Sequence, residues 1–139
     1  MAWEAILREK LEEPIDFTVA DGTGIERGAV LKITDPRTAI IVSGTSDKLA
    51  GIAAREKVAS DGRTRLAVFR RGIFDMTASG AITVGDAVTA VGAAGSVNQV
   101  IISPAAISGS SVLGTALETA SDAEVIQVYV NVGHSQGTI

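Results

Sequence analysis

The amino-acid sequence predicts a mainly β protein, namely a small β-barrel or sandwich that is partly open and follows an N-terminal arm or short helix. Segments in which apolar and polar residues alternate recur along the chain, and turn residues separate them about every ten residues. Residues 3–13 form the single segment with apolar residues at helical spacing. Apolar residues make up 46% of the chain and aromatic residues 4%, so small aliphatic side chains must build the core.

The length of 139 residues is sufficient for one domain with one hydrophobic core. We expect an N-terminal arm over residues 1–14, a single β-rich domain over 15–133 and a C-terminal tail over 134–139. The charged N-terminus does not resemble a secretion signal, and no apolar run reaches the roughly 18–20 residues that a membrane span needs. The sequence therefore predicts no membrane partner.

The N-terminal arm carries Trp3, Ile6, Leu7 and Leu11 at the spacing of an amphipathic helix. Pro14 ends any helix here, because it disfavours the helical conformation of the preceding residue. So short a helix is marginally stable in water by itself. The apolar stripe is therefore expected to pack on its own domain, on a sister subunit or on a separate partner.

After Pro14 the spacing of apolar residues changes from the helical period to the period of two that is typical of strands. The dipeptide Asp35-Pro36 and the dipeptide Asp61-Gly62 are turn signals between such segments. The strands or extended segments expected in the first half cover residues 15–19, 29–33, 38–42, 49–58 and 63–74.

The second half of the chain is rich in Ala, Gly, Ser, Thr and Val. Its clearest strand covers residues 124–132, where one face by alternation carries Ile126, Val128, Val130 and Val132. The other short strands or extended segments expected here cover residues 82–91, 96–102 and 111–117.

A weak internal repeat relates the two halves of the sequence. Residues 28–31, 49–53 and 66–69 resemble residues 85–88, 112–116 and 125–128, respectively. The repeat predicts two similar β units that pack around one core. Chance similarity in a chain so rich in Ala, Gly and Val remains the alternative.

The charges are distributed unevenly along the chain. The net charge of −4 argues against a general nucleic-acid binder, and no Lys or Arg follows Arg71. Between residues 55 and 71 the local charge is instead positive, which indicates either a solvated strand face or a docking face for an acidic partner. Arg63, Arg65 and Arg71 would share one face of the strand over 63–74, and they are candidates for polar contacts with a partner.

No combination of residues in the sequence predicts catalysis or the binding of a metal or cofactor. The chain has no Cys and a single His, so neither thiol catalysis nor a His-built or Cys-built metal site is expected. Residues 133–137 match the G-x-S-x-G pattern of hydrolases, but no His or acidic residue follows them to complete a triad. We find no phosphate loop and no calcium loop. The sequence therefore predicts no enzyme, no cofactor and no metal, and the esterase hypothesis is the weakest of the alternatives.

Several segments resemble small structural proteins of tailed viruses. The runs I-D-F-T at residues 15–18 and I-E-R-G-A-V-L at 25–31 are similar to the opening of capsid decoration or cement proteins. Residues 49–54, followed by residues 66–74, are similar to the central part of the lambda-type head decoration protein. Residues 82–88 and 114–118 fit the first group as well. The chain thus resembles the capsid decoration family over residues 15–132.

The resemblance implies a β-clip or β-tulip-like protein that sits on the outside of an icosahedral shell and stabilises it against internal pressure. It implies a homotrimer at local three-fold sites, with the major capsid protein as partner. Such a protein is made in the host cytoplasm and ends in the virion. The arm would grip the capsid through Trp3, Ile6, Leu7 and Leu11. Alternative hypotheses are another virion β-barrel module, such as a tail or fibre-base component, and a small ligand-binding adaptor.

Overall fold

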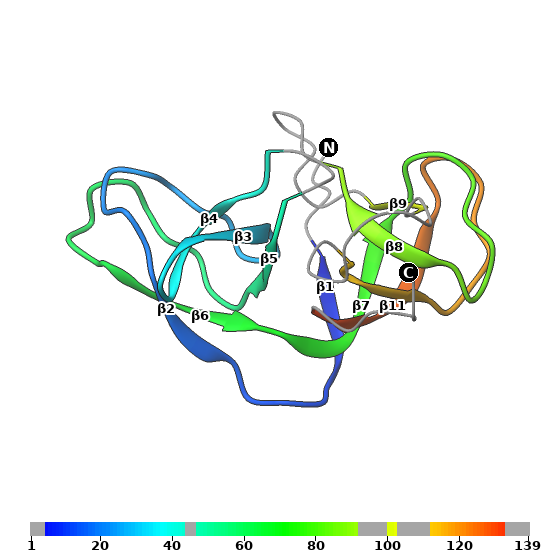
Figure 1. The fold of residues 1–139 in the computed structure, drawn as a ribbon, viewed down its shortest axis with the longest axis horizontal. Coiled ribbons are helices and arrows are strands. Elements are labelled where there is room, and N and C mark those ends of the chain that lie inside the picture. The colour runs from blue at the N-terminus through cyan, green and yellow to red at the C-terminus, as the bar shows by residue number, and fades with distance from the viewer. Residues whose placement is uncertain (1–4, 44–46, 92–99, 103–111, 133–139) are drawn as a thin grey trace.

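The computed structural model describes residues 5–43, 47–91, 100–102 and 112–132. Strands, and no helices, form the regular structure of these residues, so no helix long and apolar enough to cross a membrane is present among them. Figure 1 shows two β units side by side, with β1 between them. The strands are β1 (Ile6–Lys10), β2 (Ile15–Thr18), β3 (Val30–Asp35), β4 (Thr38–Ile41), β5 (Leu49–Ala53), β6 (Arg65–Phe69), β7 (Arg71–Thr77), β8 (Ala87–Ala90), β9 (Val100–Ile102), β10 (Gly114–Ala116) and β11 (Val125–Asn131).

The first unit, called the barrel below, is a closed barrel in the order β2-β4-β3-β5-β6. Its pairings are antiparallel except at the closure, where Thr18 of β2 pairs with Thr38 of β4 in parallel. The second unit, called the open sheet, has six strands in the order β1-β7-β11-β10-β8-β9. Its two edges are β1 and β9, so it does not close.

The two units repeat one topology. In the barrel, the hydrogen-bonded neighbours follow the order β2, β6, β5, β3 and β4. In the open sheet, the order is β7, β11, β10, β8 and β9, so each strand of the barrel has its counterpart in the open sheet. Details of the turns repeat as well: the bridge between Ile25 and Lys57 recurs between Ile82 and Ala120. This agreement confirms the repeat expected from the sequence. The third pair of similar segments is displaced by one residue, because the backbone bonds align residue 67 with residue 127.

The core has two parts rather than the single core expected for two similar halves. One cluster fills the barrel, with Phe17, Leu31 and Val68 among its members. The other cluster, called the shared core below, joins the outer surface of the barrel to the open sheet, and it includes Ile52 of β5 and Phe74 of β7. The strand β5 is buried along its whole length because it contributes to both clusters.

The predicted fold class, a mainly β protein with a small barrel, is confirmed, although the barrel itself is closed and the second sheet is the open part. The alternative of an N-terminal helix is wrong, because residues 6–10 form β1 and pair with β7. The free edge of β7 offers these residues a ladder of backbone hydrogen bonds, whereas an isolated helix of this length is marginal. A nonlocal partner therefore overrides the local helical spacing.

A partly buried ion-pair network holds two turns of the barrel together. The side chain of Lys57 is buried, and its Nζ donates to Asp21 Oδ1 at 3.1 Å and to Asp61 Oδ1 at 2.7 Å. It also donates to the carbonyl oxygens of Asp21 and Val58. Burial lowers the pKa of Lys57, but the hydrogen bonds to Asp61 and Asp21 outweigh burial, so the pKa lies above its ordinary value. The bond from Lys57 lowers the pKa of Asp61, and the N–H of Arg63 adds to this effect.

We expect the contribution of this network to stability to depend on pH. Because the pKa of Asp61 is lowered by folding, its carboxylate stabilises the fold above the ordinary pKa of Asp, about 4, and this contribution is lost as the pH falls through the lowered value. Lys57 has a raised pKa, so its own contribution is constant throughout the acid range. The variant Asp61→Asn should therefore be less stable than the native chain at pH 7, and the difference should shrink as the pH is lowered to about 2.

Urea unfolding at a series of pH values measures this difference directly. The exposed variant Asp35→Asn provides the control, since no ion pair to Asp35 is present among the described residues. A stability difference for Asp61→Asn that is the same at pH 7 and in acid would contradict the assignment.

Candidate docking surface

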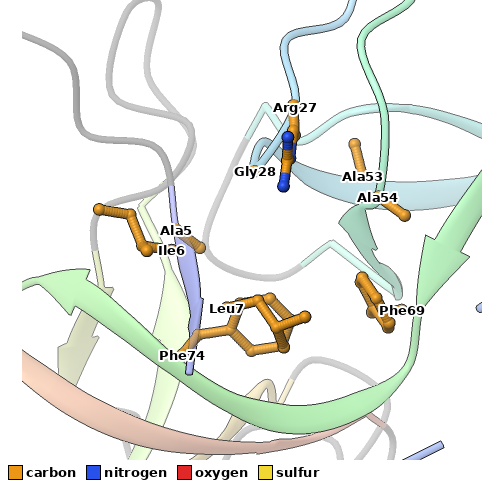
Figure 2. A pocket seen from close by; sticks show the side chains of 9 residues that line it. All are labelled: Ala5, Ile6, Leu7, Arg27, Gly28, Ala53, Ala54, Phe69 and Phe74. Carbon is orange, nitrogen blue, oxygen red and sulfur yellow. The ribbon is translucent and has the colours of Figure 1, made fainter. Parts of the chain in front are cut away.

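A groove of about 540 Å³ lies between the barrel and β1. It is called the interunit groove below. Figure 2 shows Ala5, Ile6 and Leu7 on one side of the groove and Ala53, Ala54 and Phe69 on the other. The remaining lining residues are Arg27, Gly28 and Phe74.

The aromatic part of the groove is formed where the chain crosses from one unit to the other. Phe69 ends β6 of the barrel and Phe74 lies in β7 of the open sheet. Their rings meet edge to face with centroids 5.8 Å apart, an arrangement that aromatic pairs prefer. Phe74 is fully buried and belongs to the shared core, so the groove is bordered by packed core side chains.

The strand β1 forms one side of the groove and is held at both ends. The N–H of Ala5 donates to the carbonyl of Gly28 in the barrel at 3.0 Å, and Ala5 is buried in the shared core. Residues 6–10 pair with β7, with an irregularity in register at Arg8. The other edge of β1 has no strand partner among the described residues. Unpaired strand edges of this kind accept an extended segment from another chain.

The described lining of the groove carries little charge. Among the described residues that line it, Arg27 is the one that is ionisable, and its side chain is exposed. At β1, Arg8 is engaged by Asp75 of β7, with Nε 3.5 Å from Oδ2. The described residues hold no cluster of His, Asp or Glu that could bind a metal ion. A mostly apolar groove with one cation suits an extended apolar segment that carries a carboxylate.

The structure places the predicted apolar anchors as follows. Ile6 and Leu7 lie on β1, line the groove, and expose 59% and 37% of their surface. Leu11 follows β1, is 39% exposed, and does not line the groove. Trp3 and the G-x-S-x-G pattern at residues 133–137 lie outside the described residues. Ile6 and Leu7 are thus together, although on a strand rather than on a helix.

The three candidate arginines do not share a strand, so the expectation of one common face is wrong. The expected strand over 63–74 is divided at Arg70, where the chain passes from the barrel into the open sheet. Arg63 precedes β6 and is exposed, and Arg65 begins β6, with its Nη2 4.0 Å from Asp16 Oδ2. Arg71 begins β7 and donates from Nη2 to the Tyr129 hydroxyl at 2.9 Å, which raises the pKa of Arg71.

Sequence reasoning missed the other half of the groove. Phe69 and Phe74 were expected to lie on one strand, and nothing local shows that they border a groove. The groove is also lined by Gly28, Ala53 and Ala54, which are small and therefore leave space between the barrel and β1. The one signal in the sequence is the proximity of Phe69 and Phe74, because the chain has three Phe in total.

A model of the phage cement protein family matches residues 10–132, which is most of the chain and almost all of the two β units. The chain belongs to the phage cement protein family. The resemblance to capsid decoration proteins inferred from the sequence is therefore confirmed. Membership in this family makes the protein a structural component of phage particles.

The fold of this family member is also similar to a solved structure, the N base of head fiber gp8.5 in bacteriophage phi29. The TM-score is 0.54 at 16% sequence identity, and the alignment covers 84% of this chain and 93% of the other. At this identity the likeness concerns the fold. None of the curated proteins matches the chain.

Proposed function

We propose that this cement protein decorates the outside of an icosahedral phage shell and stabilises it against internal pressure. The major capsid protein is its partner, and the protein acts as a homotrimer at local three-fold sites. It works by adhesion and catalyses no reaction. It is made in the host cytoplasm and joins the shell there. Family membership supports the capsid as partner, and the resemblance noted in the sequence suggests the trimer.

The observation that carries the proposal is the interunit groove beside the unpaired edge of β1. An extended segment of the capsid protein would add to this edge by backbone hydrogen bonds, and its apolar side chains would contact Leu7 and Phe69. Arg27 at the groove would attract an acidic residue of the same segment. Three such contacts in one trimer strengthen binding without strengthening any single contact.

The first experiment adds purified protein to phage heads that lack it. We expect saturable binding, regular protrusions in electron micrographs, and release of DNA at a higher temperature than from undecorated heads. Absence of saturable binding to heads would overturn the proposal. Binding without a change in the temperature of DNA release would overturn the stabilising role and leave decoration in place.

The likeness to the phi29 head fiber base favours a second candidate, in which this protein forms the base of a fibre on the head. The two candidates differ in what extends beyond the protein itself. Reconstructions of decorated heads should show knobs whose volume corresponds to copies of this 14.2 kDa chain alone. Additional density that projects outward from virion-derived knobs, together with another virion protein that copurifies, would favour the fibre base.

A further inference from the structure

The two β units differ sharply in charge. Residues 15–71, which contain the barrel, include ten Lys or Arg and seven Asp or Glu. Residues 72–139, which contain nearly all of β7 and all of β8–β11, include five Asp or Glu and no Lys or Arg. A partner that binds the open sheet through these residues must therefore provide any positive charge itself.

Beyond β1, the described residues of the open-sheet unit also expose three large apolar side chains, called the valine patch: Val84, Leu117 and Val125. They expose 57%, 40% and 60% of their surface, respectively. The N–H of Leu117 donates to Gln127 on β11, two residues beyond Val125, and the N–H of Val84 donates to Thr119 Oγ1, two residues beyond Leu117. The three residues therefore lie on adjoining segments at one end of the sheet. Exposed Glu118 and Glu124 are next to them in sequence.

The barrel has a surface equivalent to the valine patch, and arginines occupy several of its positions. The bond from Leu117 to Gln127 is repeated by the bond from Ala54 to Ala67, so the two connections can be aligned residue by residue. Gly28 and Gly85 likewise match, with φ values of 89° and 91°. The barrel residues equivalent to Val84, Leu117, Glu118 and Val125 are Arg27, Ala54, Arg55 and Arg65.

The repeated fold thus presents two complementary versions of one surface. The barrel version carries three arginines together with Glu26 and Glu56, and the open-sheet version carries the valine patch with Glu118 and Glu124. The arginine positions at 27 and 65 become valines, and the arginine at 55 becomes a glutamate. Opposite charges around an apolar centre are the arrangement that orients a specific protein contact.

We propose that a second copy of this chain covers the valine patch, with Arg65 of its barrel facing Glu118 and Arg55 facing Glu124. Such a contact joins unlike surfaces, so it is head-to-tail, and a head-to-tail contact forms a closed ring when its rotation closes. The inference deepens the proposed homotrimer by naming the faces that meet. Arg55 and Arg65 do not line the interunit groove, whereas Arg27 and Ala54 of the equivalent barrel surface do, so the second copy would border the groove.

The mass of the purified protein in solution, measured by light scattering, tests the patch. The native chain should form a closed oligomer, whereas Val84→Asp and Leu117→Asp should weaken association by about thirtyfold or more and shift the mass toward 14.2 kDa. Val58→Asp is the matched control, because Val58 is 56% exposed and belongs neither to the valine patch nor to the equivalent barrel residues. A monomeric native chain, or patch variants that keep the native mass, would overturn the inference.

Charge reversal tests the choice of partner surface. Glu118→Arg and Arg65→Glu should each weaken association, and the two changes in the same chain should restore it. Lys48→Glu, an exposed charge reversal elsewhere on the barrel, should leave the mass unchanged. Failure of the double variant to recover would show that Glu118 and Arg65 do not face each other and would overturn the head-to-tail contact.

The outcome for the capsid proposal is separate. A native chain that is monomeric and still binds heads overturns the homotrimer and its head-to-tail contact, and leaves the capsid as partner. A native oligomer that does not bind heads overturns the capsid proposal alone.

Discussion

Replacement of Gly114 by Ala is expected to destabilise the protein by about 3 kcal/mol or more. A Cβ atom on Gly114 would overlap the carbonyl oxygen of Tyr129, which belongs to the neighbouring strand β11. Backbone atoms in a paired strand cannot move aside as the end of a flexible side chain can, so the strands must separate. Against a typical total stability of about 5–15 kcal/mol, this loss is a large share.

Gly22→Ala is the control for this experiment, because a Cβ atom at Gly22 would meet no heavy atom within 4 Å. Its effect should lie within about 0.5 kcal/mol of zero. The difference in urea midpoint between the two variants measures the cost of the overlap. Equal midpoints would show that β10 and β11 are not as closely apposed as described.

The repeated topology extends this prediction to the barrel. Gly51 occupies the position in β5 that corresponds to Gly114, and its Cβ would overlap the carbonyl oxygen of Phe69. Its φ of 144° adds strain for any other residue. Gly51→Ala should therefore destabilise at least as much as Gly114→Ala.

Replacement of Ile6 by Asp is expected to weaken binding to phage heads by about thirtyfold or more. Ile6 lines the interunit groove on β1, and a carboxylate there would have to be desolvated by an incoming capsid segment. Because Ile6 is 59% exposed, the fold should tolerate the change. Titration of undecorated heads with labelled protein measures the affinity, and urea unfolding verifies the fold.

Val58→Asp again provides the matched control, since it adds the same charge at a residue of similar exposure outside the groove. Equal affinities of the two variants for heads would exclude the groove as the capsid contact. Deletion of residues 1–13 would be a poorer test of the groove. It would remove Ala5 from the shared core and β1 from the edge of β7, so folding and binding would change together.

The sequence was informative wherever the determining pattern is local. The alternation of Ile126, Val128 and Val130 predicted β11, and these three side chains are buried as alternation requires. Short similar segments predicted the repeat, and the matching strand orders confirm it. The absence of Lys and Arg after Arg71 is likewise visible in the sequence, although its meaning depends on where the units divide.

The candidate site was predictable in part. Ile6 and Leu7 were recognised as apolar anchor residues of the arm, and both line the interunit groove. The rest of the groove comes from Phe69 and from small residues that are far away in the sequence. These residues contribute by leaving a groove between the barrel and β1, and no local sequence pattern predicts such a groove.

The sequence by itself determined that the chain is β-rich and duplicated and that its positive charge is confined to the first half, because alternation, similarity and composition are properties of neighbouring residues. The tertiary structure alone decided that residues 6–10 form a strand, because the free edge of β7 provides hydrogen bonds that a short helix cannot match. It also decided that one unit closes between β2 and β4 whereas in the other β7 pairs with β1. Closure of the barrel and pairing of β1 with β7 both join residues that are distant in the sequence. The free energy of these contacts therefore depends on how the packed units place the strands.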